Sequence, residues 1–232
     1  MKIKSLIKHN LMRAAMTLAL ILACATAWAQ TIQSVTYIDE NGQPQTVNAT
    51  QITSDNFRMG SDRWYYVSGT VGSDSDYLYL STENGTHNLI LCDGATLTVS
   101  QVSQYSDKYA KLKVYGQSGG TGKLNVGNGT MVNAISNCDF ALYGGEVTLT
   151  YYSNGHGINK NVDFNGGKLT ATSGVNAIGG NTTINATSGW IKASKYGGSV
   201  TIAEGKYMKD ETGRCYKGTL TDGSHVAWDV DL

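Results

Sequence analysis

Apolar and polar residues alternate in short runs that recur along the middle of the chain. Such alternation over about four to eight residues is typical of β-strands with one buried face. Each run opens with a glycine, and the glycines lie 28, 23, 22 and 22 residues apart. The five runs are GATLTV from Gly94, GKLNV from Gly122, GEVTL from Gly145, GKLTA from Gly167 and GWIKA from Gly189.

A second alternating stretch precedes each of these runs, as in KLKV ending at Val114 and VDF ending at Phe164. A third, very short apolar element recurs around Ile135, Ile158 and Ile178. Three short strands per repeat of about 22 residues, joined by glycine and asparagine corners, are the pattern of a solenoid. We therefore predict an all-β fold, a single-stranded parallel β-helix of about five to six turns over residues 76–205.

Stacked turns place equivalent residues above one another at the spacing of strands in a sheet, about 4.8 Å. On the outside, Lys123, Glu146 and Lys168 fall at one equivalent position on three successive turns, where opposite charges support the register. The predicted inward columns are Leu97, Leu124, Val147, Leu169 and Ile191, with Val99, Val126, Leu149, Ala171 and Ala193 beside them.

Both ends depart from the repeat. Residues 30–75 include SVTYIDENGQPQTV, which predicts a hairpin around Asn41-Gly42. Residues 206–232 include YMKDETGRCYKGTL, which predicts another. A solenoid must cover its terminal strands or it will pair with other chains, so we expect both segments to be caps.

The amino terminus has the composition of a secretory signal peptide, residues 1–29. A positive start is followed by the short apolar stretch AAMTLALILACATA and the small-residue site Ala27-Trp28-Ala29. Lipid attachment at Cys24 is an alternative, although its lipoprotein box is a poor match. We expect a protein secreted or displayed on the outer surface after cleavage near Ala29, with no transmembrane segment in the mature chain.

Cleavage leaves 14 Lys and Arg against 18 Asp and Glu, a net charge of about −4. Without a basic stripe, the mature chain is not expected to bind nucleic acid. Its three cysteines, Cys92, Cys138 and Cys215, match no zinc pattern, so no metal or other cofactor is expected.

The stretch GQSGGTGKL from Gly116 to Leu124 invites comparison with a phosphate-binding loop. Gln117 stands where that motif needs its first glycine, and Leu124 stands where it needs Ser or Thr. The following residues predict a strand rather than a helix, so we interpret the stretch as a solenoid corner with a small insertion.

The phrases HNLILCDGATLTV, LKVYGQSGGTGKLNV and ALYGGEVTLT resemble secreted β-helix proteins of gut Bacteroidota, often described as carbohydrate-binding-like or hypothetical. The resemblance covers about residues 33–222. It implies an exported, cell-surface or extracellular protein, and it transfers no active-site residue.

Parallel β-helices also include polysaccharide lyases and glycosidases, which makes an enzyme the alternative. Acid–base cleavage of a glycosidic bond needs two carboxylates at a defined separation. Asp139 and Asp163 are predicted to face outward on neighbouring turns, about 8 Å apart, with Lys113 on the same face. Such pairs are also ordinary in the solvated corners of a solenoid.

Three aromatic residues are candidates for ligand binding. Tyr115 and Tyr143 are predicted at the same outward position on adjacent turns, and Trp190 in the column that begins with Lys123. Exposed rings at this spacing can stack on sugars, or they can simply shield the strands. We expect a non-catalytic protein for extracellular recognition or adhesion, with a glycan or surface protein as partner, and a structural spacer as a further alternative.

Overall fold

The computed structural model describes residues 31–81, 84–104, 110–127, 133–151, 155–220 and the backbone of 227–230. Nearly all of these residues belong to one compact unit, Gln33–Leu232, the second of two units in the chain. The expected signal peptide, 1–29, and Cys24 lie outside the described residues. Within those residues there is no helix, and hence none that would cross a membrane.

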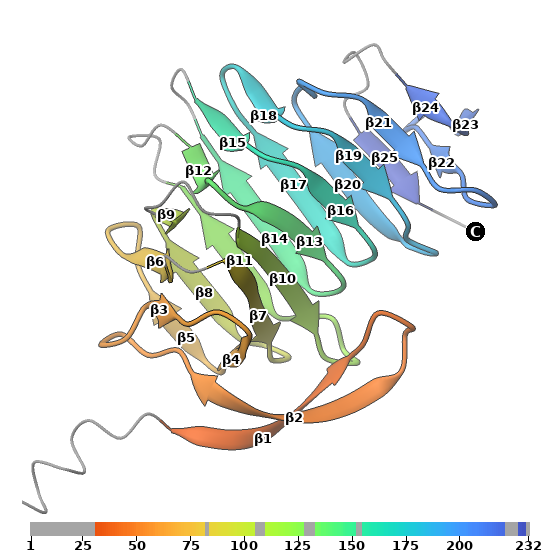
Figure 1. Ribbon diagram of the computed structural model, residues 1–232. Helices are drawn as coiled ribbons and strands as arrows, with labels where there is room; N and C mark the ends of the chain where they lie inside the picture. Colours follow the sequence, from red (N-terminus) through yellow and green to blue (C-terminus); the bar gives the residue numbers. More distant parts are fainter. Residues whose placement is uncertain are drawn as a thin grey trace, which may run out of the picture. The chain divides into compact units, whose positions relative to one another are not determined.

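Three sheets contain the strands of the second unit (Figure 1). The ten-stranded sheet has the order β1(Ile32–Ile38), β2(Pro44–Gln51), β4(Arg63–Val67), β7(Gly85–Leu91), β10(Ala110–Gly116), β13(Asp139–Leu142), β16(Val162–Phe164), β19(Thr182–Ile184), β21(Val200–Ile202), β24(Thr219–Leu220). The nine-stranded sheet has the order β23(Cys215–Tyr216), β22(Met208–Lys209), β25(Ala227–Val230), β20(Gly189–Ala193), β17(Lys168–Thr172), β14(Glu146–Thr150), β11(Lys123–Val126), β8(Thr96–Val99), β5(Thr70–Gly72). The six-stranded sheet has the order β18(Asn176–Ile178), β15(His156–Ile158), β12(Asn133–Ser136), β9(Gln101–Gln104), β6(Tyr77–Leu80), β3(Arg58–Met59).

The chain visits the three sheets in rotation, which confirms the predicted parallel β-helix. Each turn takes one strand from each sheet, from β4–β5–β6 through to β16–β17–β18, so the described residues form about five turns. Parallel pairing begins as early as β2, which pairs with β4, inside the segment assigned from the sequence to the amino-terminal cap.

The predicted register is confirmed by strand pairing. Leu97, Leu124, Val147, Leu169 and Ile191 are consecutive partners across β8, β11, β14, β17 and β20. All five side chains are fully buried. On the opposite face Glu146 lies between Lys123 and Lys168, with nitrogen–oxygen distances of 3.7 and 2.9 Å. The nearer ammonium, that of Lys168, lowers the pKa of Glu146.

At the carboxyl-terminal end the strands reverse direction. The predicted hairpin is confirmed as β22–β23, and its turn is held by the Asp210 carboxylate, which accepts hydrogen bonds from the backbone N–H groups of Thr212 and Arg214. β24 pairs antiparallel with β21, and β25 with β20. These antiparallel strands pair with the last strand edges of the solenoid, whose backbone hydrogen-bonding groups would otherwise need a further turn.

The predicted amino-terminal hairpin is also confirmed, as β1 and β2 around a turn in which Gly42 has φ +75°. The Asp39 carboxylate accepts hydrogen bonds from the backbone N–H groups of Asn41 and Gln43. β2 is paired with β4 only through Thr50 and Gln51. The remainder of the hairpin therefore takes its position from side-chain contacts.

One inward position of the ten-stranded sheet carries a histidine. His87 lies in the same column as Leu112 and Phe140 and is fully buried. Its Nδ1 lies 3.1 Å from the carbonyl oxygen of Gly60, while Nε2 has no hydrogen-bond partner in the described part of the chain. Burial lowers the pKa of this imidazole.

The inward columns predict a large difference between two neighbouring substitutions. Leu169→Ala leaves a cavity in the stack and is expected to lower the free energy of unfolding by about 2–5 kcal/mol. Thr170→Ala, one residue along on the outer face, is expected to change it by less than about 0.5 kcal/mol. Urea unfolding followed by circular dichroism measures both, and equal losses would contradict the assigned faces.

His87 predicts a stability that depends on pH. Its folded pKa is below that of the unfolded chain, about 6.5, so the unfolded state takes up a proton first. The free energy of unfolding should therefore fall as the pH drops below about 6.5. In His87→Leu this component should be absent, as measured by urea unfolding between about pH 8 and pH 5. Identical pH profiles for the two proteins would be inconsistent with a buried neutral imidazole.

Candidate functional site

Tyr115 and Tyr143 occupy equivalent positions on adjacent turns, as predicted. Each follows an inward residue of the paired strands β10 and β13, where Val114 is the partner of Leu142. Their rings stack with centroids 4.8 Å apart and planes inclined by 9°. The direction of both side chains, away from the solenoid core, follows from the alternation along the strands.

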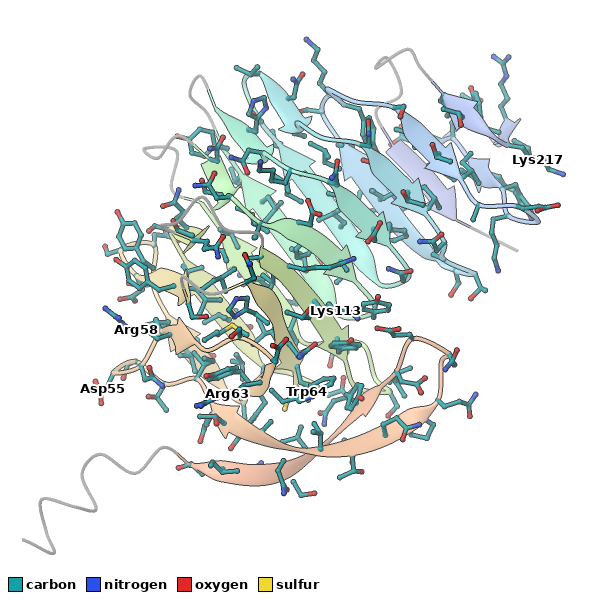
Figure 2. The ribbon with its side chains drawn as sticks, in the orientation of Figure 1. Asp55, Arg58, Arg63, Trp64, Lys113 and Lys217 are labelled. Atoms are coloured by element: carbon teal, nitrogen blue, oxygen red, sulfur yellow. The ribbon has the colours of Figure 1, made fainter. Side chains whose placement is uncertain are left out.

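The expectation that Tyr115 is exposed is wrong, because the β1–β2 hairpin covers this part of the sheet. Tyr115 is only 3% exposed. The Tyr37 ring from β1 lies 5.1 Å from that of Tyr115 and 4.6 Å from that of Trp64, on β4 (Figure 2 labels Trp64). This second apolar cluster is separate from the solenoid core and consists of Val35, Ala49, Tyr66, Ile90 and Tyr115, with Tyr37, Val47, Trp64, Cys92 and Tyr143 against it.

A carboxylate at the tip of the hairpin fastens it to the sheet. Glu40 accepts a charged hydrogen bond of 2.6 Å from Lys113 and one of 3.3 Å from the Tyr115 hydroxyl. Lys113 lowers the pKa of Glu40. Burial, followed by the charge of Glu40, raises the pKa of Tyr115, so the phenol stays protonated and donates. Gln117 adds a further tie by donating to the carbonyl oxygen of Thr36, at 2.8 Å.

A hollow of about 250 Å³ lies beside the hairpin, at the glycine corner that links the ten- and nine-stranded sheets. Its lining consists of Tyr143, Ile38, Gln117 and Lys168, together with the glycines Gly116, Gly120, Gly144, Gly145 and Gly167. Tyr143 is half-buried: Tyr115 stacks on its ring, which still lines the hollow. We call this hollow, with Tyr143 and Lys168, the corner hollow.

The floor of the corner hollow has to be glycine. A Cβ at Gly116 would lie 2.6 Å from the backbone nitrogen of Gly145 on the next turn, which leaves no room for a side chain. At Gly167, φ is +76° and a Cβ would lie 2.6 Å from the carbonyl oxygen of Gly145. Close stacking of the corners therefore leaves the backbone of one turn against that of the next, with Gly116 and Gly145 themselves buried.

Trp190 lies in the predicted column, directly beside Lys168 across β17 and β20. Its ring centroid is 5.5 Å from the Lys168 ammonium, which also pairs with Glu146. Trp190 does not line the corner hollow and reaches it only through Lys168. Lys168 and Ile38 also line the corner hollow, but the sequence did not indicate them as site residues. They meet there only because the fold brings the corner and the hairpin together.

The two candidate catalytic acids have the predicted offset of two residues, since Asp139 is the partner of Lys111 and Asp163 that of Ala141. Asp163 forms an ion pair with Lys111. Asp139 accepts a hydrogen bond from the backbone N–H of Asn161, 3.1 Å away. Lys113, from the same face, is turned to Glu40. These contacts give each carboxylate a structural role.

The glycine-rich insertion of Gly116–Leu124 does surround a negatively charged group, and this group is a side-chain carboxylate of the protein itself. The Asp93 carboxylate, from the preceding turn, accepts hydrogen bonds of 2.9 and 3.1 Å from the backbone N–H groups of Gly119 and Thr121. A Cβ on Gly119 would lie 2.7 Å from this carboxylate. The interpretation as an enlarged corner is confirmed, since Lys123 begins β11.

Titratable side chains do not gather into a metal site within the residues that the structure describes. Cys138 is buried, which raises the pKa of its thiol to about 12; Cys92 is half-buried and Cys215 exposed. All three cysteines are free.

No protein-family model matches the chain, and no curated protein or solved structure matches it. The structure itself defines the class: a parallel β-solenoid in which an amino-terminal hairpin covers an aromatic patch on one outer face. A fold of this class does not fix a function, so the function has to be argued from the site.

We call the hydrogen bonds that Glu40 accepts from Lys113 and Tyr115 the Glu40 latch. These contacts predict how firmly the hairpin is held against the sheet. Because the pKa of Glu40 is lowered in the folded state, the ion pair is present above about pH 4.3 and is lost as the pH falls through the lower folded value. Glu40→Gln should therefore speed amide hydrogen exchange in residues 33–51 near neutral pH. Mass spectrometry of peptides from this segment measures the effect.

The matched control is Glu211→Gln. Glu211 is exposed and lies 3.8 Å from Lys192, far along the solenoid. This substitution should leave exchange in residues 33–51 unchanged. Wild-type exchange rates in Glu40→Gln would show that the latch does not hold the hairpin.

Proposed function

We propose that this protein recognises glycans outside the cell, without catalysis, and binds a sugar in the corner hollow. The observation that carries the proposal is a hollow lined by a partly exposed tyrosine ring, by a glycine corner without side chains and by Lys168. Sugars present an apolar ring face together with many hydroxyl groups. Aromatic rings match the first, and peptide groups and charged side chains match the second.

Stacking on Tyr115 holds the Tyr143 ring in an orientation suited to sugar binding. The 4.8 Å contact between their rings and the hairpin over Tyr115 fix the orientation of the Tyr143 ring before any ligand arrives. A rigid aromatic side chain loses little conformational entropy on binding. Burial and the charge of Glu40 raise the pKa of Tyr143, so its hydroxyl remains a hydrogen-bond donor at neutral pH.

The volume of the corner hollow suits one sugar unit or the end of a chain. About 250 Å³ is below the roughly 300–1,000 Å³ of pockets for drug-sized ligands. Beyond Tyr143 the same outward column continues with Asn165 and Asn185, whose backbone N–H groups bond to the preceding turn. These amides offer further hydrogen bonds to a longer glycan that extends along the solenoid.

Secretion and the resemblance to β-helix proteins of gut Bacteroidota fit this proposal and stay predictions from the sequence. The enzymatic alternative, through Asp139 and Asp163, and the structural spacer are outcomes that the same experiments distinguish. Release of reducing ends or unsaturated products from polysaccharides, lost in Asp163→Asn, would favour the enzyme.

We expect the substitution Tyr143→Ala to weaken glycan binding. Removing the ring takes away one wall of the hollow and should weaken binding by about 1–2 kcal/mol, about fivefold to thirtyfold, measured by glycan array and then by calorimetry with the best glycan. Tyr143→Phe keeps the ring and should retain most of the affinity. Tyr115 is a poor choice for this test, because its side chain is buried under the hairpin.

Two results would contradict the proposal. One is an array on which the folded wild-type protein binds no glycan, which would favour the spacer. The other is binding by Tyr143→Ala that equals that of the wild type, which would place the sugar elsewhere on the surface.

A further inference from the structure

A second hollow, of about 320 Å³, lies at the edge of the six-stranded sheet, and it shares no residue with the corner hollow. It is bounded by the segment 54–58, which leads into β3, and by residues 75–79, which lead into and along β6. Figure 2 labels Asp55 and Arg58 beside this edge. No motif in the sequence pointed to it. We call it the edge hollow.

The edge hollow contains a cation placed on aromatic rings. Arg58 on β3 is the strand partner of Tyr79 on β6, and its guanidinium carbon lies 5.6 Å from the centroid of the Tyr79 ring. Tyr77 stacks beside Tyr79, with centroids 5.9 Å apart and planes inclined by 15°. The Arg58 side chain is exposed and has no ion-pair partner among the described residues.

Such an arrangement leaves the hydrogen-bonding edge of the guanidinium available. The contact with the Tyr79 ring uses none of the guanidinium N–H donors. Those donors form a planar fork that matches a carboxylate in two parallel hydrogen bonds. Arg58 therefore offers the edge hollow a partner for a planar anionic group.

The lining of the edge hollow also contains two carboxylates, those of Asp55 and Asp76. Asp55 is exposed, and Asp76 is half-buried, with its Oδ2 accepting a 2.8 Å hydrogen bond from the Ser73 hydroxyl. With one Arg and two Asp in its lining, the hollow has a formal charge of −1, and Arg58 is the one lining group that attracts an anion. A ligand that suits this lining carries a carboxylate for Arg58 and hydroxyl donors for the two Asp side chains, with an apolar face for the tyrosines.

We propose that the edge hollow binds a sugar residue bearing a carboxylate, a uronic acid unit, with its carboxylate on Arg58, its ring against Tyr77 and Tyr79, and its hydroxyls toward Asp55 and Asp76. This site extends the recognition function to acidic glycans. It stands independently of the corner hollow, because the two hollows have no lining residue in common.

The test compares two probes by calorimetry: a trimer of galacturonic acid, and the same trimer with its carboxylates reduced to neutral alcohols. The wild-type protein should bind the acidic trimer at least about tenfold more tightly. Arg58→Gln should remove this preference, because hydrogen bonds to charged groups contribute about tenfold to a hundredfold in affinity. Arg58→Lys, which keeps the charge and loses the fork, should recover only part of it.

Arg63→Gln is the matched control, since Arg63 is an exposed arginine outside the edge hollow (labelled in Figure 2). It removes the same charge and should bind the acidic trimer like the wild type. Tyr143→Ala should also leave this binding unchanged, which separates the edge hollow from the proposed function of the corner. Thermal unfolding of each variant establishes that it is folded.

Several results would overturn the proposal. They are equal wild-type affinity for the two trimers, binding of neither trimer by the wild type, and acidic-trimer affinity in Arg58→Gln within twofold of the wild type. Displacement of the acidic trimer by inorganic sulfate at equal concentration would also overturn it, because it would reveal a site for simple anions.

Discussion

In-register stacking of successive turns is the constraint on which the rest of this structure depends. Main-chain hydrogen bonds between parallel strands fix the spacing, and burial of the inward columns fixes the register, since a shift by one residue would turn Leu124 and Leu169 to solvent. The positions of the outward side chains follow from this register. Stacked tyrosines, the ladder of Lys123, Glu146 and Lys168, and the pairing of Arg58 with Tyr79 are all consequences of the core register.

The same stacking shapes the corners. Where the backbone of one turn rests on that of the next, as at Gly116 and Gly145, only glycine fits. The corner then carries no side chains that would fill the neighbouring hollow. Where a corner is lengthened, as between Gly116 and Leu124, its extra N–H groups need acceptors, and Asp93 supplies them.

The outer face of the ten-stranded sheet changes in character along the solenoid. Its column of Tyr66, Ile90, Tyr115 and Tyr143 is apolar where the hairpin lies and becomes Asn165 and Asn185 beyond it. An apolar face needs a cover, and β1 and β2 supply it with Tyr37, Val35 and the Glu40 latch. Tyr143 lies at the boundary between the covered and the solvated part, and this position leaves its ring available to a ligand.

The sequence by itself determined the parallel β-helix, the inward columns, both terminal hairpins and the outward direction of Tyr115, Tyr143 and Trp190, because alternation and a repeat of about 22 residues are local signals. Only the tertiary structure decided that the hairpin covers Tyr115, that Asp163 is held by Lys111, and that Arg58 lies on Tyr79. The hairpin has no periodic partner in the sequence and is docked by contacts between residues such as Glu40 and Lys113, far apart along the chain. The edge hollow likewise lies between a loop and a strand of the next turn. No local pattern of residues predicts that these two segments are neighbours in space.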